Sequence, residues 1–109
     1  MNDTRPFLLL RARATPDADD ALGRWLRETH VRDARAIPGF VDVRTGRTAG
    51  GTWLCIYTFE GAEAVQASLS SKEAAYARGA WERWAGHLDE LRIEIFSPLG
   101  ALAIFQSRS

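Results

Sequence analysis

The sequence contains one cysteine, Cys55, and one lysine, Lys72, and it carries no surplus charge of either sign. One cysteine excludes an internal disulfide and a metal site built from cysteines. The 14 basic residues are balanced by 14 acidic ones, so the basic surplus that is typical of a nucleic-acid-binding module is missing. The sequence has no run of about 20 apolar residues, the length that a bilayer-spanning helix requires, and its start does not resemble a signal peptide. We therefore expect a cytoplasmic protein whose partners include neither a membrane nor a nucleic acid.

The sequence does contain enough apolar material for one domain. Of its 109 residues, 46% are hydrophobic and 26% are charged, which are ordinary proportions for a globular protein. A chain of this length buries about 60–70% of its extended surface, so pairing with a second copy would supplement its stability. We expect one domain over residues 1–98 and a C-terminal tail over residues 99–109. The apolar residues of that tail could pack on a partner protomer or cover a pocket mouth, with a disordered end as the alternative.

Hydrophobic periodicity predicts six elements. Strands are expected over 7–13, 40–47, 52–59 and 91–97, and helical regions over 15–36 and 62–88, the second interrupted near 68–71. The run 15–17 supplies an N-terminal cap, a proline and an acid to the first helix, and the Pro-Gly pair at 38–39 ends it. The order β-α-β-β-α-β is the ferredoxin-like α+β arrangement, in which both helices cover one face of an antiparallel sheet.

The period of two along each strand separates two sets of side chains. The aliphatic set, which we expect beneath the helices, is Leu8, Leu10, Val41, Val43, Leu54, Ile56, Ile93 and Ile95. The other set mixes aromatic and charged residues: Leu9, Arg11, Phe40, Asp42, Arg44, Trp53, Cys55, Tyr57, Phe59, Arg92, Glu94 and Phe96. Because exposed aromatic patches are unusual and unpaired buried charges are costly, we expect this open face to line a cavity or a dimer interface closed by a second sheet. The alternative is a solvated face held by salt bridges.

A histidine stands beside the buried stripe of the first helix. His30 follows Leu26 by four residues, and Asp33 follows His30 by three, close enough to orient the imidazole ring or raise its pKa. The stretch Trp25-Leu26-Arg27-Glu28-Thr29-His30-Val31, followed by Ala36-Ile37-Pro38-Gly39-Phe40, resembles the EthD-like and related dimeric α+β barrel proteins. The resemblance extends over residues 7–97. It implies a homodimer that holds a small-molecule ligand in each protomer and needs no cofactor.

The resemblance also implies a chemistry. Cofactor-free isomerases, polyketide cyclases and dehydratase-like proteins of this superfamily use a pocket histidine as acid or base, which assigns that role to His30. Methylmuconolactone-type isomerases carry a tyrosine on the strand after the Pro-Gly turn. Val43 occupies that place here, and Tyr57 on the next strand could supply the phenol instead.

We therefore predict a proton-transfer site for an aromatic, lactone or polyketide-like compound. Its catalytic residues are His30, Tyr57 and Asp33, and its substrate contacts are Arg11, Phe40, Trp53, Cys55, Trp81, Arg92 and Phe96. Either Arg11 or Arg92 would hold a carboxylate or enolate oxygen. Cys55 also has a simpler interpretation as a small buried residue.

Three other functions remain open. The same fold could bind a ligand or serve in a stress response without catalysis, with a structural His30. Trp81, Trp84 and His87 partly resemble the second-helix residues of cofactor-independent monooxygenases and haem-degrading relatives, although the asparagine expected on the first strand is missing. An open sheet bearing aromatics could also stack RNA bases, but the neutral charge does not favour it.

Overall fold

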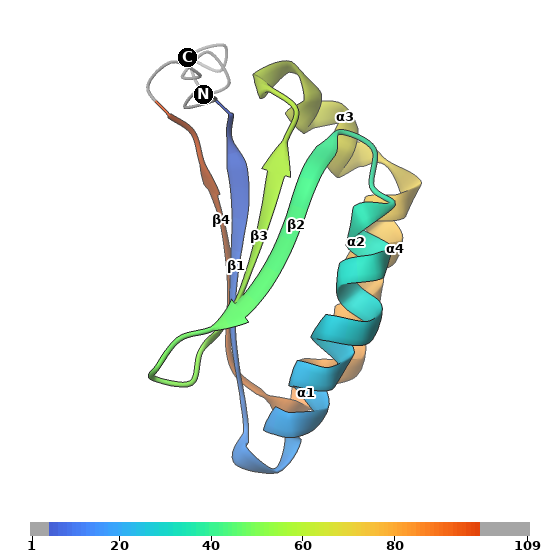
Figure 1. The fold of residues 1–109 in the computed structure, drawn as a ribbon. Helices are drawn as coiled ribbons and strands as arrows, with labels where there is room; N and C mark the ends of the chain where they lie inside the picture. The colour runs from blue at the N-terminus through green and yellow to red at the C-terminus, as the bar shows by residue number, and fades with distance from the viewer. Residues whose placement is uncertain (1–4, 99–109) are drawn as a thin grey trace.

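The computed structural model describes residues 5–98, and in it a four-stranded antiparallel sheet is covered on one face by helices (Figure 1). The strands are β1 (Phe7–Ala14), β2 (Phe40–Arg47), β3 (Trp53–Phe59) and β4 (Leu88–Phe96), arranged in the order β2-β3-β1-β4. The predicted ferredoxin-like α+β fold is confirmed. The predicted tail at 99–109 lies outside the described residues.

Each helical region is built from several segments. The first contains a 3₁₀ turn (Pro16–Ala18), α1 (Asp19–Trp25), a π-helical turn (Leu26–His30) and α2 (Val31–Arg35). The second contains a 3₁₀ turn (Ala62–Ala64), α3 (Val65–Ser70), α4 (Lys72–Ala80) and a 3₁₀ segment (Trp81–His87). Its predicted interruption is confirmed: Ser71 is extended, and its hydroxyl accepts a hydrogen bond from the Ala74 amide at 3.1 Å, which caps α4.

The Pro-Gly turn fixes the end of the first helical region against the second. Gly39 has a φ of +94°, a conformation that favours glycine, and a Cβ at this position would overlap the Ser68 hydroxyl. The buried Ser68 hydroxyl donates to the Pro38 carbonyl at 2.5 Å, and the Glu60 amide donates to the Gly39 carbonyl at 2.7 Å. The turn therefore holds α2, α3 and the end of β3 at fixed positions.

The predicted orientation of β3 is wrong. Tyr57 pairs with Leu8 and Cys55 pairs with Leu10, so these side chains share the helix-covered face. Leu54 and Ile56, which we expected beneath the helices, point to the open face. Both alternating sets in β3 are apolar, so the period of two could not choose between them. The structure places the bulkier set under the helices: Trp53, Cys55, Tyr57 and Phe59 are all buried.

A bulge accounts for a second correction, in β2. The pairing shifts between Phe40 and Asp42, which leaves Val41 as an extra residue with 45% of its surface exposed. Phe40 consequently joins Val43 on the helix-covered face, and its ring lies 5.0 Å from that of Phe59. The predictions of a buried Val41 and an open-face Phe40 are therefore wrong, because they assumed an uninterrupted strand.

The open face is consequently more aliphatic than predicted. Of the five aromatics assigned to it, only Phe96 is there, stacked on Phe7 at 4.7 Å between ring centroids. Leu9, Leu54 and Ile56 are partly exposed on this face, together with these two aromatic rings and the charged residues. The expected charges remain on this face, with Arg44 bound to Asp42 at 3.1 Å and Arg92 near Glu94 at 4.0 Å. The described helices all lie on the opposite side of the sheet (Figure 1).

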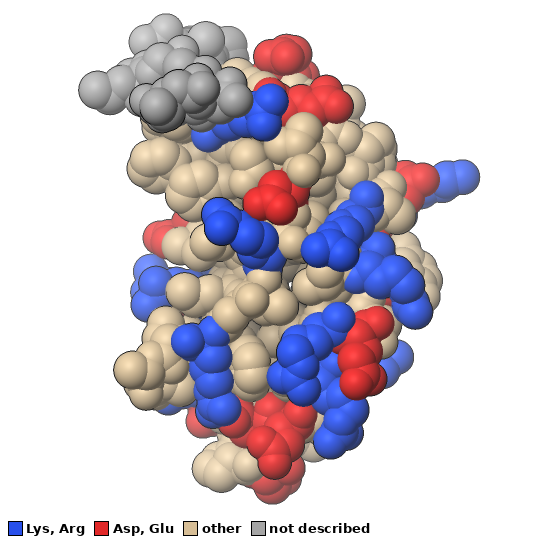
Figure 2. Space-filling view, viewed as in Figure 1, with Lys and Arg blue, Asp and Glu red and all other residues tan. Residues whose placement is uncertain are grey.

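Charges of both signs are interspersed on the face of the molecule shown in Figure 2, which carries no continuous basic surface. Across residues 5–98, none of the helices combines the length and hydropathy needed to cross a membrane.

Candidate functional site

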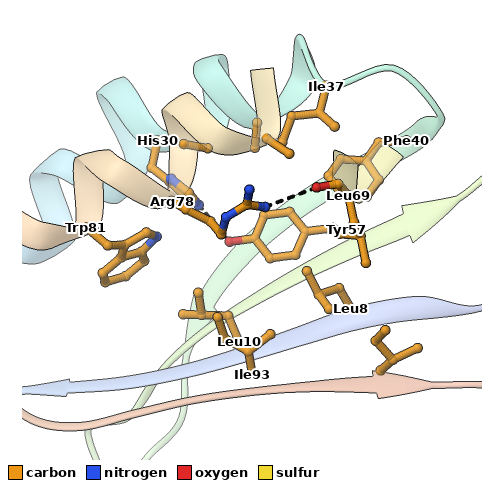
Figure 3. A pocket seen from close by; sticks show the side chains of 14 residues that line it. Leu8, Leu10, His30, Ile37, Phe40, Tyr57, Leu69, Arg78, Trp81 and Ile93 are labelled. Carbon is orange, nitrogen blue, oxygen red and sulfur yellow. Dashed lines mark hydrogen bonds between the residues drawn. The ribbon is translucent and has the colours of Figure 1, made fainter. Parts of the chain in front are cut away.

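A cavity of about 350 Å³ lies inside the protomer, between the sheet and the helices (Figure 3). Its walls come from the sheet and from both helical regions, and most of its lining is aliphatic: Leu8, Leu10, Ala34, Ile37, Leu69, Ala74, Ala77, Ile93 and Ile95. The remaining lining residues are His30, Phe40, Tyr57, Arg78 and Trp81. Its size and apolar walls are typical of small-molecule sites. We predicted a pocket or a dimer interface on the open face, and this cavity lies on the opposite, helix-covered side of the sheet.

His30 and Tyr57 meet inside this cavity. The Nε2 atom of His30 lies 2.6 Å from the hydroxyl oxygen of Tyr57, a hydrogen bond that joins the first helical region to the central strand β3. Both side chains are buried, with 3% and 4% of their surfaces exposed. Two residues that sequence reasoning proposed separately are therefore in direct contact.

Burial keeps both groups uncharged. It lowers the pKa of His30 from 6.5 to about 4, although the carboxylate of Asp33 acts in the opposite direction. It also raises the pKa of the Tyr57 phenol well above its ordinary value, with the neighbouring Cys55 adding to the effect. At neutral pH the pair is a neutral imidazole beside a protonated phenol. Either the phenol O–H donates to Nε2, or the Nε2–H of the other tautomer donates to the phenol oxygen.

A π-helical turn sets the direction of the His30 side chain. The Val31 amide bonds to the Leu26 carbonyl, five residues back, and this widens the helix just before His30. As a result, the imidazole lies against the indole of Trp25, 5.1 Å away between ring centroids. π-helical turns are rare in proteins overall, but those that occur are often found at functional sites. No feature of the sequence predicted this one.

Two tryptophans, Trp25 and Trp81, pack against His30, and a third, Trp84, packs against Trp25. The ring of Trp81 lies edge-on to His30 at 5.4 Å and to Trp25 at 5.0 Å, and Trp84 lies 5.6 Å from Trp25. Nδ1 of His30 is buried, and no described group forms a hydrogen bond with it. Since nothing described holds Nδ1 in one protonation state, the imidazole proton can occupy either nitrogen.

The structure brings four predicted site residues into the cavity, namely His30, Tyr57, Phe40 and Trp81. Trp53 and Cys55 are buried on the same side of the sheet but do not line it. The Trp53 indole donates to Asp19 at 3.0 Å and lies under the guanidinium of Arg47, so it ties β3 to α1. Burial raises the pKa of the Cys55 thiol, and a thiol that stays protonated is a weak nucleophile.

Three other predicted contacts lie away from the cavity. Arg11, Arg92 and Phe96 are on the open face, so the structure places no predicted cation near His30. Asp33 bonds to the adjacent Arg32 at 3.3 Å and not to the imidazole, and the two residues line a separate surface hollow.

Arg78 is the lining residue with clear chemistry that sequence reasoning missed. It lies on α4 three residues before Trp81, a spacing that puts both side chains on one face of the helix. This spacing was the one feature of the sequence that could have indicated that Arg78 lines the cavity. Trp81, Trp84 and His87 do not converge, because Trp81 lines the cavity, Trp84 is buried beside Trp25 and His87 is exposed. Within residues 5–98, no three histidine, cysteine or acidic side chains gather as metal ligands would.

No family model and no curated protein sequence matches the chain. Several solved structures do match it in fold. An EthD family protein from Bacillus halodurans superimposes with a TM-score of 0.66 at 21% identity, over 83% of this chain and 95% of its own. An antibiotic biosynthesis monooxygenase-like protein from Nitrosomonas europaea gives 0.67 at 13% identity, over 88% and 91%. A protein from Mycobacterium tuberculosis gives 0.67 at 21%, over 87% and 95%.

The chain has the fold of the dimeric α+β barrel proteins. The predicted resemblance is confirmed at that level. At these identities the likeness concerns the fold alone.

The buried imidazole gives the fold an acid-sensitive step. As pH falls from 6.5 to about 4, the unfolded chain protonates this histidine while the folded chain does not, so the free energy of unfolding decreases. The decrease attributable to His30 is about 3 kcal/mol between neutral pH and pH 4. Urea unfolding at a series of pH values should show a shallower decrease in His30→Gln than in the wild type. His87→Gln controls for loss of an exposed imidazole. Equal slopes in wild type and His30→Gln would contradict a buried neutral His30.

Proposed function

We propose that the protein catalyses a cofactor-free proton transfer on a small apolar organic molecule held in the cavity beneath its helices. The observation that carries this proposal is the 2.6 Å contact between His30 and Tyr57 inside an otherwise aliphatic and aromatic chamber. Nδ1 of His30 is buried beside this contact without a described hydrogen-bond partner, a desolvation cost that a purely structural core would avoid. Isomerisation, cyclisation and dehydration of an aromatic, lactone or polyketide-like compound all need such a transfer.

The mechanism follows from the protonation states. The phenol of Tyr57 passes its proton to Nε2 of His30 and takes a proton from an acidic C–H or O–H of the substrate. This step leaves an imidazolium, a neutral phenol and a substrate anion, so charge and protons balance. The new anion lies beside the imidazolium and raises the pKa of His30 above its value in the empty cavity. The relay then runs in reverse to a second atom of the substrate, which completes an isomerisation without any oxidant.

The cavity walls suit a flat substrate. Phe40 stacks on Tyr57, with 5.5 Å between their centroids and 29° between their planes, and Trp81 stands edge-on to His30. Aromatic faces of this kind favour planar rings and exclude water from the proton relay.

Two other functions share this site. Several structural neighbours are named after antibiotic biosynthesis monooxygenases. Cofactor-free oxygenation would begin with the same proton removal, after which the substrate anion reacts with O₂. A protein that binds a ligand without turnover would need only the apolar and aromatic walls of the cavity, and not the proton relay.

Deuterium incorporation tests the relay. In D₂O, the wild type should accelerate exchange into an enolisable bicyclic ketone such as 2-tetralone, followed by mass spectrometry. His30→Gln and Tyr57→Phe should each lower the enzyme-dependent rate by about 10²–10⁴-fold, because each interrupts the relay. His87→Gln should be unaffected. Oxygen uptake in the same assay would identify an oxygenase, and wild-type binding without exchange would overturn the catalytic proposal.

We further propose that two copies pair through their open sheet faces to form a homodimer. This face exposes Leu9, Leu54 and Ile56 in the middle of the sheet, and Phe96 is 52% exposed at its end. Apolar surface in such an arrangement, flanked by charges, is typical of a protein interface.

Light scattering after gel filtration should give twice the chain mass of 12.1 kDa for the wild type. Ile56→Arg should give a folded monomer, because it places a charge in the centre of the interface. Gln66→Arg, on the exposed surface of α3, should remain dimeric. A dimeric Ile56→Arg or a monomeric wild type would refute pairing through this face.

A further inference from the structure

The cavity has one permanent cation in its wall. Its other ionisable lining groups, His30 and Tyr57, are neutral and are hydrogen-bonded to each other. Arg78 is exposed to solvent and also lines the cavity, so its charge lies where the cavity meets water. At neutral pH, the ionisable groups that line the cavity therefore carry a single positive charge.

The Arg78 side chain is held in position but not neutralised. Nη1 donates to the Leu69 carbonyl of α3 at 3.1 Å, across the interruption at Ser71, and Figure 3 shows the guanidinium directed along this bond. None of the ion pairs among residues 5–98 includes Arg78. A guanidinium has five N–H donors, so most of them remain available to a ligand.

We propose that the ligand is a planar apolar carboxylate, with its carboxylate bound by Arg78 at the cavity mouth and its ring system inside against His30 and Tyr57. The fork of guanidinium donors matches the two oxygens of a carboxylate, and the apolar walls match the rest of such a molecule. This inference rests on the proposed function, because it takes the cavity as the site of chemistry. It replaces Arg11 and Arg92, which lie on the other face, as the anion-binding residue.

The proposed orientation also explains how the proton relay would be aimed. With the carboxylate at Arg78, the ring system of the ligand would meet the phenol of Tyr57, which lines the same cavity. Arg78 is thus a binding and positioning residue, distinct from the proton-transfer pair.

A matched pair of probes tests the proposal: 1-naphthoate and the uncharged naphthalene-1-carboxamide, which has nearly the same shape. By calorimetry at pH 7, the wild type should bind the carboxylate about 10-fold or more tightly than the amide, the ratio expected for one charge-assisted contact near the surface. Arg78→Gln should lose this preference while its affinity for the amide changes less than about twofold. Arg78→Lys should keep part of it, because lysine retains the charge but not the fork. Arg83→Gln, an exposed arginine outside the cavity, is the matched control.

The outcomes separate this inference from the proposed function. Equal binding of the two probes to the wild type would overturn the role of Arg78 and leave the cavity as the site. A carboxylate preference that survives in Arg78→Gln, with the circular dichroism spectrum unchanged, would also overturn it. Failure of both probes to bind the wild type would count against the cavity as a ligand site, and so against both proposals.

Discussion

The hydrogen bond between His30 and Tyr57 is the contact on which the site depends, because it joins the two layers of the fold across a cavity. It requires the π-helical turn that directs His30 inward and the choice of face that puts Tyr57 under the helices. It also requires an apolar surrounding, which removes water and keeps both groups neutral. The remaining desolvation cost lies at Nδ1 of His30, which is buried without a described hydrogen-bond partner. Under the proposed function, this pair is the proton relay that acts on a substrate in the cavity.

Much of the fold follows from local chemistry that is visible in the sequence. The Pro-Gly turn, the break at Ser71 and the order of elements are set by residues with strong backbone preferences, and all three were predicted. The face of β3 was not, because alternation carries information only where one of its two sets is polar. In β3 both sets are apolar, so pairing with β1 decides the orientation, and that pairing is a tertiary property.

The site was only partly predictable, because contacts between a helix and a strand are also tertiary properties. His30 and Tyr57 were identified from residue type and resemblance, but their contact depends on how a helix is placed over a strand. Arg78 was missed because an arginine on an exposed helix ordinarily indicates a solvated surface, and only the cavity beneath α4 makes it a lining residue. The predicted cations Arg11 and Arg92 lie on the open face, away from the cavity that holds His30. Residue types in the sequence thus indicated the polar groups of the cavity more readily than the face of the sheet on which they lie.

The central claim is that ligands bind beneath the helices and not on the open face, and methyl NMR tests it most directly. With isoleucine and leucine methyls labelled, a titration with 2-tetralone should shift the signals of Leu8, Leu10 and Ile93, which line the cavity. The signals of Leu54 and Ile56, on the opposite face of the same sheet, should stay in place. Shifts confined to Leu54 and Ile56 would contradict the account and place the ligand on the open face.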